Sequence, residues 1–245
     1  MAFMDVLPDP NRKILDSGKE NDSTGTAGPG FASIKVSSNR STMLDKTNSG
    51  RAVARSVAGH SWNVDVRYNP LTRDEFEPIY SFLLSRLGKL NPFFIELPNH
   101  VSSRDSTFTT FAAANTISVQ TDTTTASAGQ TYILIDAGSA FTANPKPGDM
   151  FTITDSSNAN HVKVYRITRV ETNTDYDTSI ADQPASTSEK RIHFTPPLAY
   201  SVSDNSTLDF SYPRMRVRLA GDVQEYSLGT NNLYQFSLKL EEALP

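Results

Sequence analysis

Histidine is the side chain best suited to acid–base and metal chemistry near neutral pH, and the chain carries four of them. They lie far apart, at His60, His100, His161 and His193. None belongs to an H-E-x-x-H metal motif or to a pair at helical spacing, and no G-x-S-x-G nucleophile turn is present. We therefore expect each histidine to be a surface or turn residue. The absence of cysteine also excludes a thiol nucleophile and thiolate metal ligands.

The acidic residues form no better candidate for a catalytic or metal site. Asp74 and Glu75 are neighbours, but adjacent residues on a helix point in different directions, so helix capping explains them better than an acid–base pair does. Asp175 and Asp177 begin like a calcium loop, yet the glycine and the terminal glutamate that such a loop requires are missing. No phosphate-binding G-x-x-x-x-G-K-[ST] motif occurs. We expect no catalytic residue, no metal site and no cofactor.

A stripe of three arginines is the one local basic feature. The spacing of two between Arg214, Arg216 and Arg218 puts their guanidinium groups on one face of a strand. Such a face can be solvated, can pair with carboxylates of a partner subunit, or can contact nucleic-acid phosphates. A formal net charge of -4 and a pI near 5.6 give no general attraction for polyanions, so we expect no specific nucleic acid as a partner.

Composition describes an ordinary globular protein. The 245 residues allow one or two domains, and 37% hydrophobic with 20% charged residues is typical of a folded chain. The first residues do not resemble a secretory leader, and no apolar run approaches the roughly 18 residues of a membrane span. We therefore expect synthesis in the cytoplasm and no membrane partner.

The elements that would position these side chains are mostly strands. Residues 1–30 are rich in Pro, Gly, Asp and Ser, and predict an extended N-terminal arm. Alternation from Phe31 onward predicts half-buried strands, one of which holds Trp62 in the core. Thr72 and Glu75 have the spacing of a capping box, with Leu71 and Phe76 as a hydrophobic staple. They predict a helix at about 73–87.

The segment between the helix and the last strands has a different composition. Gly88 is the expected C-terminal stop of the helix, and Phe93 lies in a strand bounded by prolines. Residues 102–212 are rich in Thr and Ser, and we expect no helix there but a separate small β-barrel or sandwich. Alternation returns in residues 213–245. If these strands pair with residues 31–101, the two segments form one discontinuous core around an inserted domain at 102–212.

The order of motifs resembles that of phage distal tail and minor tail structural proteins. In that family a Gly-x-x-Trp strand leads into a Pro-Leu-Thr turn, a Glu-Phe-x-x-Ile helix, a glycine and a Phe-rich strand ending in proline. The corresponding residues are Gly59, Trp62, Pro70, Leu71, Thr72, Glu75, Phe76, Ile79, Gly88, Phe93, Phe94 and Pro98. Pro147-Gly148-Asp149 and Phe194-Thr195-Pro196-Pro197 are similar as well, so the resemblance covers roughly residues 31–245.

The resemblance implies a fold, a place and a set of partners. The fold is mainly β: a tail-tube-like β-sandwich or barrel with one flanking α-helix, plus the inserted small β-domain. The implied function is a non-enzymatic ring, commonly a hexamer, at the distal end of the tail tube in the virion. Expected partners are further copies of the chain, the tail tube protein, the hub or baseplate proteins and the tape-measure protein.

Assembly of a ring would need contact surfaces, and the C-terminal strands are the first candidates. Edge strands can extend a sheet into a neighbour, so we expect inter-subunit contacts at Arg214, Arg216, Arg218, Tyr234 and Phe236. The N-terminal arm could order across an adjacent subunit. Two other functions stay open: a host-surface carbohydrate or receptor binder that uses Tyr132, Tyr165, Tyr176 and Tyr200, and an enzyme of cell-wall lysis.

Overall fold

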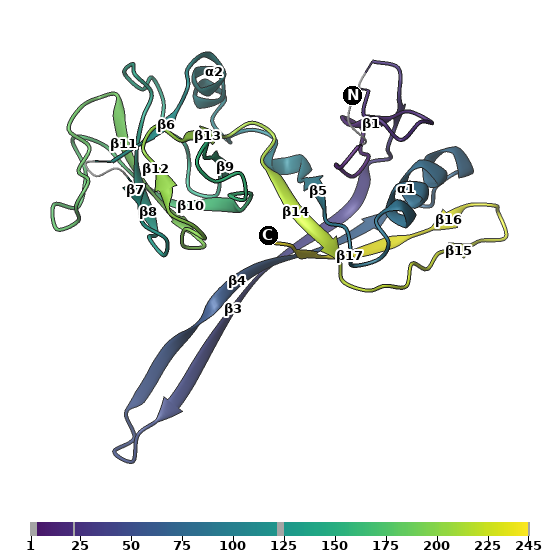
Figure 1. Ribbon diagram of the computed structural model, residues 1–245, viewed down its shortest axis with the longest axis horizontal. Helices are drawn as coiled ribbons and strands as arrows, with labels where there is room; N and C mark the ends of the chain where they lie inside the picture. Colours follow the sequence, from purple (N-terminus) through teal and green to yellow (C-terminus); the bar gives the residue numbers. More distant parts are fainter. Residues whose placement is uncertain (1–3, 22, 122–124, 245) are drawn as a thin grey trace. The chain divides into compact units, whose positions relative to one another are not determined.

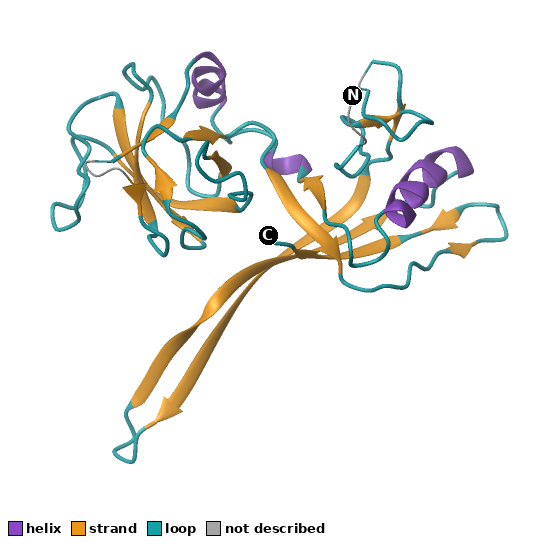
Figure 2. Cartoon of the chain, in the orientation of Figure 1, coloured by secondary structure: helices purple, strands orange, loops and turns teal. Residues whose placement is uncertain are grey.

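The computed structural model describes residues 4–21, 23–121 and 125–244, and the chain divides into two units. The first unit comprises residues 1–95 and 216–243, and the second contains residues 96–215. The sequence had placed these divisions at 101 and 213, a few residues away. Strands dominate both units, which confirms the predicted mainly β fold (Figure 2).

A five-stranded sheet forms the first unit, in the order β3-β4-β17-β14-β5 (Figure 1). Its strands are β3 (Phe31–Lys46), β4 (Ala52–Tyr68), β17 (Ser237–Glu242), β14 (Arg214–Leu219) and β5 (Phe93–Glu96). Period-two alternation puts one apolar row of each strand on the same face. Segments far apart in sequence thus pair directly. Along the chain, the second unit lies between β5 and β14. Trp62 and Phe93 are buried in this core as predicted.

Helix α1 (Arg73–Ser85) begins where the capping pattern placed it. The backbone N–H of Thr72 donates to Oε2 of Glu75 at 2.9 Å, and its hydroxyl donates to the same oxygen at 2.8 Å. These bonds lower the pKa of Glu75, the one from the backbone more than the one from the hydroxyl. Leu71 and Phe76 are both buried, as the staple requires. Gly88 has φ of +67°, the left-handed conformation expected after a helix.

The N-terminal residues differ from the expected extended arm. They fold back on themselves through the short strands β1 (Lys13–Ile14) and β2 (Thr26–Ala27). Leu7 donates its N–H to the carbonyl of Phe94 at 2.8 Å, and Met4, Val6 and Leu7 are buried. Proline and glycine do prevent long regular elements here. They do not prevent the apolar side chains from packing against the edge of β5, which this segment covers.

The second unit is a closed six-stranded barrel in the order β10-β11-β8-β6-β13-β9. Its strands are β6 (Ser118–Gln120), β8 (Tyr132–Asp136), β9 (Met150–Thr154), β10 (Val164–Glu171), β11 (Glu189–Thr195) and β13 (Thr207–Asp209). Alternate residues of these strands fill the interior with Ile, Phe, Val and Leu. Three further short pieces are the helical turn η1 (Pro98–His100), the β7–β12 pair (Thr125–Ala126 with Val202–Ser203) and the β15–β16 pair (Ser227–Leu228 with Tyr234–Gln235).

The expectation of no helix in residues 102–212 was wrong. Helix α2 (Ser106–Ala114) begins at Asp105, whose carboxylate accepts hydrogen bonds from the N–H groups of Thr107 at 2.9 Å and Phe108 at 3.3 Å. Phe108 and Phe111 are buried in the barrel core. The Ser/Thr content suggested a loop, but an Asp N-cap followed by two phenylalanines one turn apart is a helix signal. The chain therefore has two α-helices among its described residues, one in each unit.

Candidate functional site

Strands β3 and β4 form a hairpin that continues far beyond the sheet (Figure 1). Strand β17 pairs with β4 only along residues 63–67, so beyond Asn63 the two strands pair with each other alone. A register shift between Arg40 and Thr42 marks a bulge, after which pairing resumes from Thr42↔Ser56 to Lys46↔Ala52. We call residues 41–59 the distal hairpin. It is a two-stranded ribbon with no third strand among the described residues.

The distal hairpin exposes an unusual combination of side chains. Met43 is 63% exposed, Leu44 75% and Val53 49%. Three cations, Lys46, Arg51 and Arg55, stand beside a single carboxylate, Asp45, so the segment carries a net charge of about +2. No ion pair joins these cations to a carboxylate of the described chain. The segment is thus basic on a chain whose formal net charge is -4.

A ribbon of this kind gains little stability from its own chain. An isolated two-stranded hairpin is marginally stable in water because it buries almost no apolar surface. In addition, β3 pairs with β4 alone among the described strands, so alternate backbone N–H and C=O groups along its outer edge have no strand partner there. Proteins normally shield such an edge. The hairpin therefore has an exposed edge that no other described strand of its own chain covers.

The three arginines of the predicted contact stripe have different surroundings in the structure. Arg214 Nε donates to Oε1 of Glu96 at 2.9 Å, and the Glu96 side chain is only 1% exposed. Arg218 forms a longer, exposed pair with Glu241 at 3.7 Å. Arg216 lies between them in β14, half-buried. Two of the three arginines thus already have carboxylate partners within their own chain.

Tyr234, which is half-buried in β16, and Phe236, which is buried, both pack within their own chain. Their rings pack on Phe76 of α1, with centroid distances of 4.4 Å for Tyr234 and 5.6 Å for Phe236, and Phe236 is 5% exposed. Strands β14 and β17 also lie inside the sheet, so they are not edges. Alternation shows that one face of a strand is buried. It does not show whether a helix of the same chain or another subunit covers that face.

The tyrosines of the carbohydrate-binding alternative do not share one surface role. Tyr165 is fully buried in the barrel, and its hydroxyl contacts His161 Nε2 at 2.8 Å and accepts a hydrogen bond from the N–H of Ala199 at 3.0 Å. Tyr132 lies against His193 with ring centroids 5.8 Å apart. Tyr165 therefore belongs to the core and cannot stack on a sugar.

The strongest charge cluster of the barrel ties down a loop of the same unit. Arg191 is fully buried; its Nε donates to Glu171 Oε2 at 2.7 Å, and its terminal nitrogens donate to backbone carbonyls of residues 177–182. Burial by itself would raise the pKa of Glu171, but hydrogen bonds from Arg191 and from the N–H of Asp177 leave that pKa below its usual value. The arrangement satisfies every part of a buried guanidinium, which is a structural role.

No three His, Asp or Glu side chains among the described residues converge as a metal site would require. Likewise, no helix in the described ranges has the length and apolar character needed to cross a membrane.

Sequence reasoning did not identify the hairpin, although a signal was present. Thr47-Asn48-Ser49-Gly50 is a turn sequence between two runs of Ser, Thr, Ala, Val and Arg. In the structure Thr47 donates its N–H to the carbonyl of Arg51 at 3.0 Å, and Gly50 has φ of +80°. The runs were interpreted as separate short strands because their apolar residues are few. The described side chains of residues 41–55 are exposed, and an exposed ribbon needs no hydrophobic period.

The sequence matches none of the protein-family models with which it was compared, and it matches no curated protein. What supports a function is therefore the geometry of the hairpin, together with the order of motifs along residues 31–245.

Proposed function

We propose that the protein is a structural subunit of a phage tail, which forms a ring at the distal end of the tail tube and joins the tube to the hub or baseplate. The observation that carries this proposal is the distal hairpin. It projects from a well-packed sheet, exposes Met43, Leu44 and Val53, and is paired only with itself among the described residues. In a repeated subunit the next copy can cover this exposed ribbon.

The symmetry of the contact supports a closed ring. The hairpin is one surface and the site that receives it is another, so the contact between copies is heterologous. Heterologous contacts generate rings when the rotation between copies closes, and filaments when it does not. The motif order resembles that of distal tail proteins, which assemble as rings, commonly hexamers.

The experiment that tests the proposal removes the ribbon and leaves the sheet. Arg40 and His60 face each other in the register, so residues 41–59 can be replaced by an Asn-Gly turn that joins them. We expect the full chain to form a single ring species in native mass measurement and the shortened chain to be a monomer. The mass of the ring divided by the mass of one chain gives the copy number.

A matched control keeps the hairpin and alters its turn. In this variant Asn48 and Ser49 are replaced by Gly, so that the tip changes sequence but the strands keep their length. Both variants should keep the near-UV circular dichroism of the wild type, because the aromatic cluster around Phe76 does not involve the hairpin. A full-length chain that stays monomeric at every concentration, or a shortened chain that still forms the ring, would overturn the proposal.

A further inference from the structure

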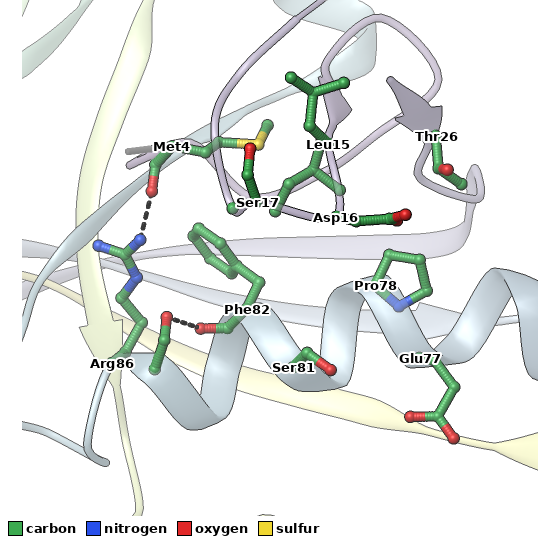
Figure 3. A pocket seen from close by; sticks show the side chains of 13 residues that line it. Met4, Leu15, Asp16, Ser17, Thr26, Glu77, Pro78, Ser81, Phe82 and Arg86 are labelled. Atoms are coloured by element: carbon green, nitrogen blue, oxygen red, sulfur yellow. Dashed lines mark hydrogen bonds between the residues drawn. The ribbon is translucent and has the colours of Figure 1, made fainter. Parts of the chain in front are cut away.

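A groove of about 690 Å³ lies between the N-terminal residues and helix α1, both in the first unit (Figure 3). The guanidinium of Arg86 donates to the carbonyl of Met4 and lies 4.3 Å from the centre of the Phe82 ring. The Glu77 carboxylate points away from the groove and pairs with Arg73 at 3.4 Å. Contacts of the same chain thus hold both charged groups in place. The barrel of the second unit carries a charged cluster of a different kind on its outer wall.

This cluster consists of four side chains from two neighbouring strands. In the register of β10 and β11, Arg169 is opposite His193 and Glu171 is opposite Arg191. Opposed residues of an antiparallel pair share one face of the sheet, and successive residues alternate between the two faces. Ile192, which lies between Arg191 and His193, is fully buried in the barrel core. The four side chains therefore lie on the outer face of the barrel.

The members of the cluster differ in how firmly they are held. The Arg191 side chain is fully buried, that of Glu171 is 6% exposed, that of His193 14% and that of Arg169 52%. Arg191 also donates to backbone carbonyls of residues 177–182. Among the described residues, Arg169 has hydrogen bonds or ion pairs only with His193 and Glu171. Arg169 is therefore the member of the cluster that is free to move into solvent.

One ring nitrogen of His193 has two polar neighbours. Its Nε2 lies 2.9 Å from a terminal nitrogen of Arg169 and 3.1 Å from Oε1 of Glu171. The arginine nitrogen can only donate a hydrogen bond, and an ionised carboxylate can only accept one. Nε2 therefore accepts from Arg169 when it carries no proton, and it donates to Glu171 when it carries one. The two hydrogen bonds exclude each other.

The distances in the structure fit the unprotonated nitrogen. The same terminal nitrogen of Arg169 lies 2.5 Å from Oε1 of Glu171, so its two N–H groups bridge the imidazole and the carboxylate. A proton on Nε2 would put a second donor at this carboxylate oxygen and remove the acceptor that Arg169 uses on the ring. Oε2 of Glu171 takes no part, because it accepts from Nε of Arg191 at 2.7 Å.

We infer that this cluster is a pH-sensitive switch, in which proton uptake at His193 moves the Nε2 hydrogen bond from Arg169 to Glu171 and releases the Arg169 side chain. The outer wall of the barrel then presents a free guanidinium in acid and a bound one near neutral pH. Arg191 and the loop that it holds stay in place, because they use the other carboxylate oxygen. The switch lies in the second unit and does not depend on the proposed ring.

The groups around His193 determine the pH range of the exchange. Burial lowers its pKa most, the two arginines lower it as well, and Glu171 acts in the opposite direction. Tyr132 of β8 faces the ring with centroids 5.8 Å apart, and the Asp177 carboxylate of the following loop interacts with the two arginines. Glu171 stays ionised, because its own pKa is below its usual value. The exchange therefore takes place below pH 6.5, the ordinary pKa of a histidine.

Hydrogen exchange at the C2 position of histidine, read by mass spectrometry on the full chain, gives the pKa of each histidine separately. We expect Arg169→Gln to raise the pKa of His193, because the neutral ring loses a charged donor and the protonated ring loses a nearby cation. The matched control is Arg166→Gln, another exposed arginine of β10, which acts on His100. It should raise the pKa of His100 and leave that of His193 unchanged.

Crystal structures of the full chain on either side of the measured His193 pKa show the exchange itself. We expect Arg169 to contact His193 and Glu171 in the neutral structure and to have left both in the acidic one, where Nε2 still contacts Glu171. In His193→Gln the position of Arg169 should not depend on pH. An Arg169 that keeps both contacts in the acidic structure would overturn the switch. So would an unchanged His193 pKa in Arg169→Gln, or a His193 that stays neutral until acid unfolds the protein.

Discussion

Arg214 donates a hydrogen bond from Nε to Oε1 of Glu96 across 2.9 Å, and the two residues are the first of strand β14 and the last of strand β5. The chain leaves the sheet of the first unit at Glu96 and returns to it at Arg214. The ion pair therefore lies where the chain leaves the sheet at the end of β5 and returns to it at the start of β14. The carboxylate is almost fully buried, while the arginine side chain is 38% exposed.

Replacing Arg214 by Met should destabilise the protein, because the buried Glu96 carboxylate loses its guanidinium. We expect a loss of about 2–3 kcal/mol, less than the ~3–5 kcal/mol of a fully buried pair. The control Arg218→Met removes an exposed pair at 3.7 Å and should cost under about 1 kcal/mol. Urea unfolding of the two variants measures the difference. Equal losses would show that burial of Glu96 does not set the energy of its pair.

Phe76→Ala should destabilise the first unit strongly, because Phe76 contacts Tyr234, Phe236, Tyr80 and Tyr226 within one chain. Removing a buried phenylalanine costs about 3–5 kcal/mol through lost burial and the cavity left behind. Leu84→Ala on the exposed side of the same helix should change stability by less than about 0.5 kcal/mol. The unfolding free energy is best measured in the shortened-hairpin chain. A small loss there would mean that the aromatic rings need a neighbouring subunit after all.

Gly88→Ala should be more costly than Gly50→Ala, although both glycines have positive φ, +67° and +80° respectively. An added Cβ at Gly88 would stand 2.8 Å from Oδ1 of Asp222, while at Gly50 it would meet no atom within 4 Å. Moving Asp222 would break its hydrogen bond with the N–H of Lys89 at 3.1 Å.

The left-handed backbone alone costs about 1–2 kcal/mol at either position, and the lost hydrogen bond at Gly88 adds about 1 kcal/mol. Thermal or urea unfolding checks this difference. Restoration of stability by Asp222→Ser in the Gly88→Ala background would confirm that the carboxylate is the obstacle. If the double variant loses as much stability as Gly88→Ala alone, the loss comes from the left-handed backbone and not from the Asp222 carboxylate.

His161 should make stability depend on pH below neutrality. Burial lowers its pKa from 6.5, although the nearby Asp155 carboxylate acts in the opposite direction. The unfolded chain then binds a proton that the folded chain excludes, so stability is complete above about pH 6.5 and falls as pH falls toward the folded pKa. His100 and His193 are shifted the same way, mainly by burial.

The variant His161→Gln can keep a hydrogen bond to Tyr165 but has no proton to take up. Its unfolding free energy should therefore decline less steeply than that of the wild type between pH 7 and pH 5. The measurement is the urea midpoint followed by circular dichroism across this range. Parallel pH profiles for variant and wild type would contradict a linked titration of His161.

Local signals in the sequence were sufficient for several elements. The Thr72–Glu75 capping box gave the start of α1, because the groups that form it are three residues apart and need nothing from the rest of the fold. The composition of residues 102–212 predicted a small β-barrel or sandwich, and the structure has a closed barrel in this part of the chain. The helix at 106–114 was missed because its Ser/Thr composition outweighed the short spacing of its two phenylalanines.

The candidate site depended on contacts that no local pattern contains. The sequence by itself determined a mainly β chain without cysteine, a capped helix, and a separate composition for the second unit. Only the tertiary structure decided that Tyr234 and Phe236 face Phe76, that β14 and β17 lie inside the sheet, and that β3 and β4 run on as a hairpin. The physical reason is that alternation encodes burial but not the partner that provides it. The side chains of the distal hairpin whose burial is described are exposed, so they leave no such pattern.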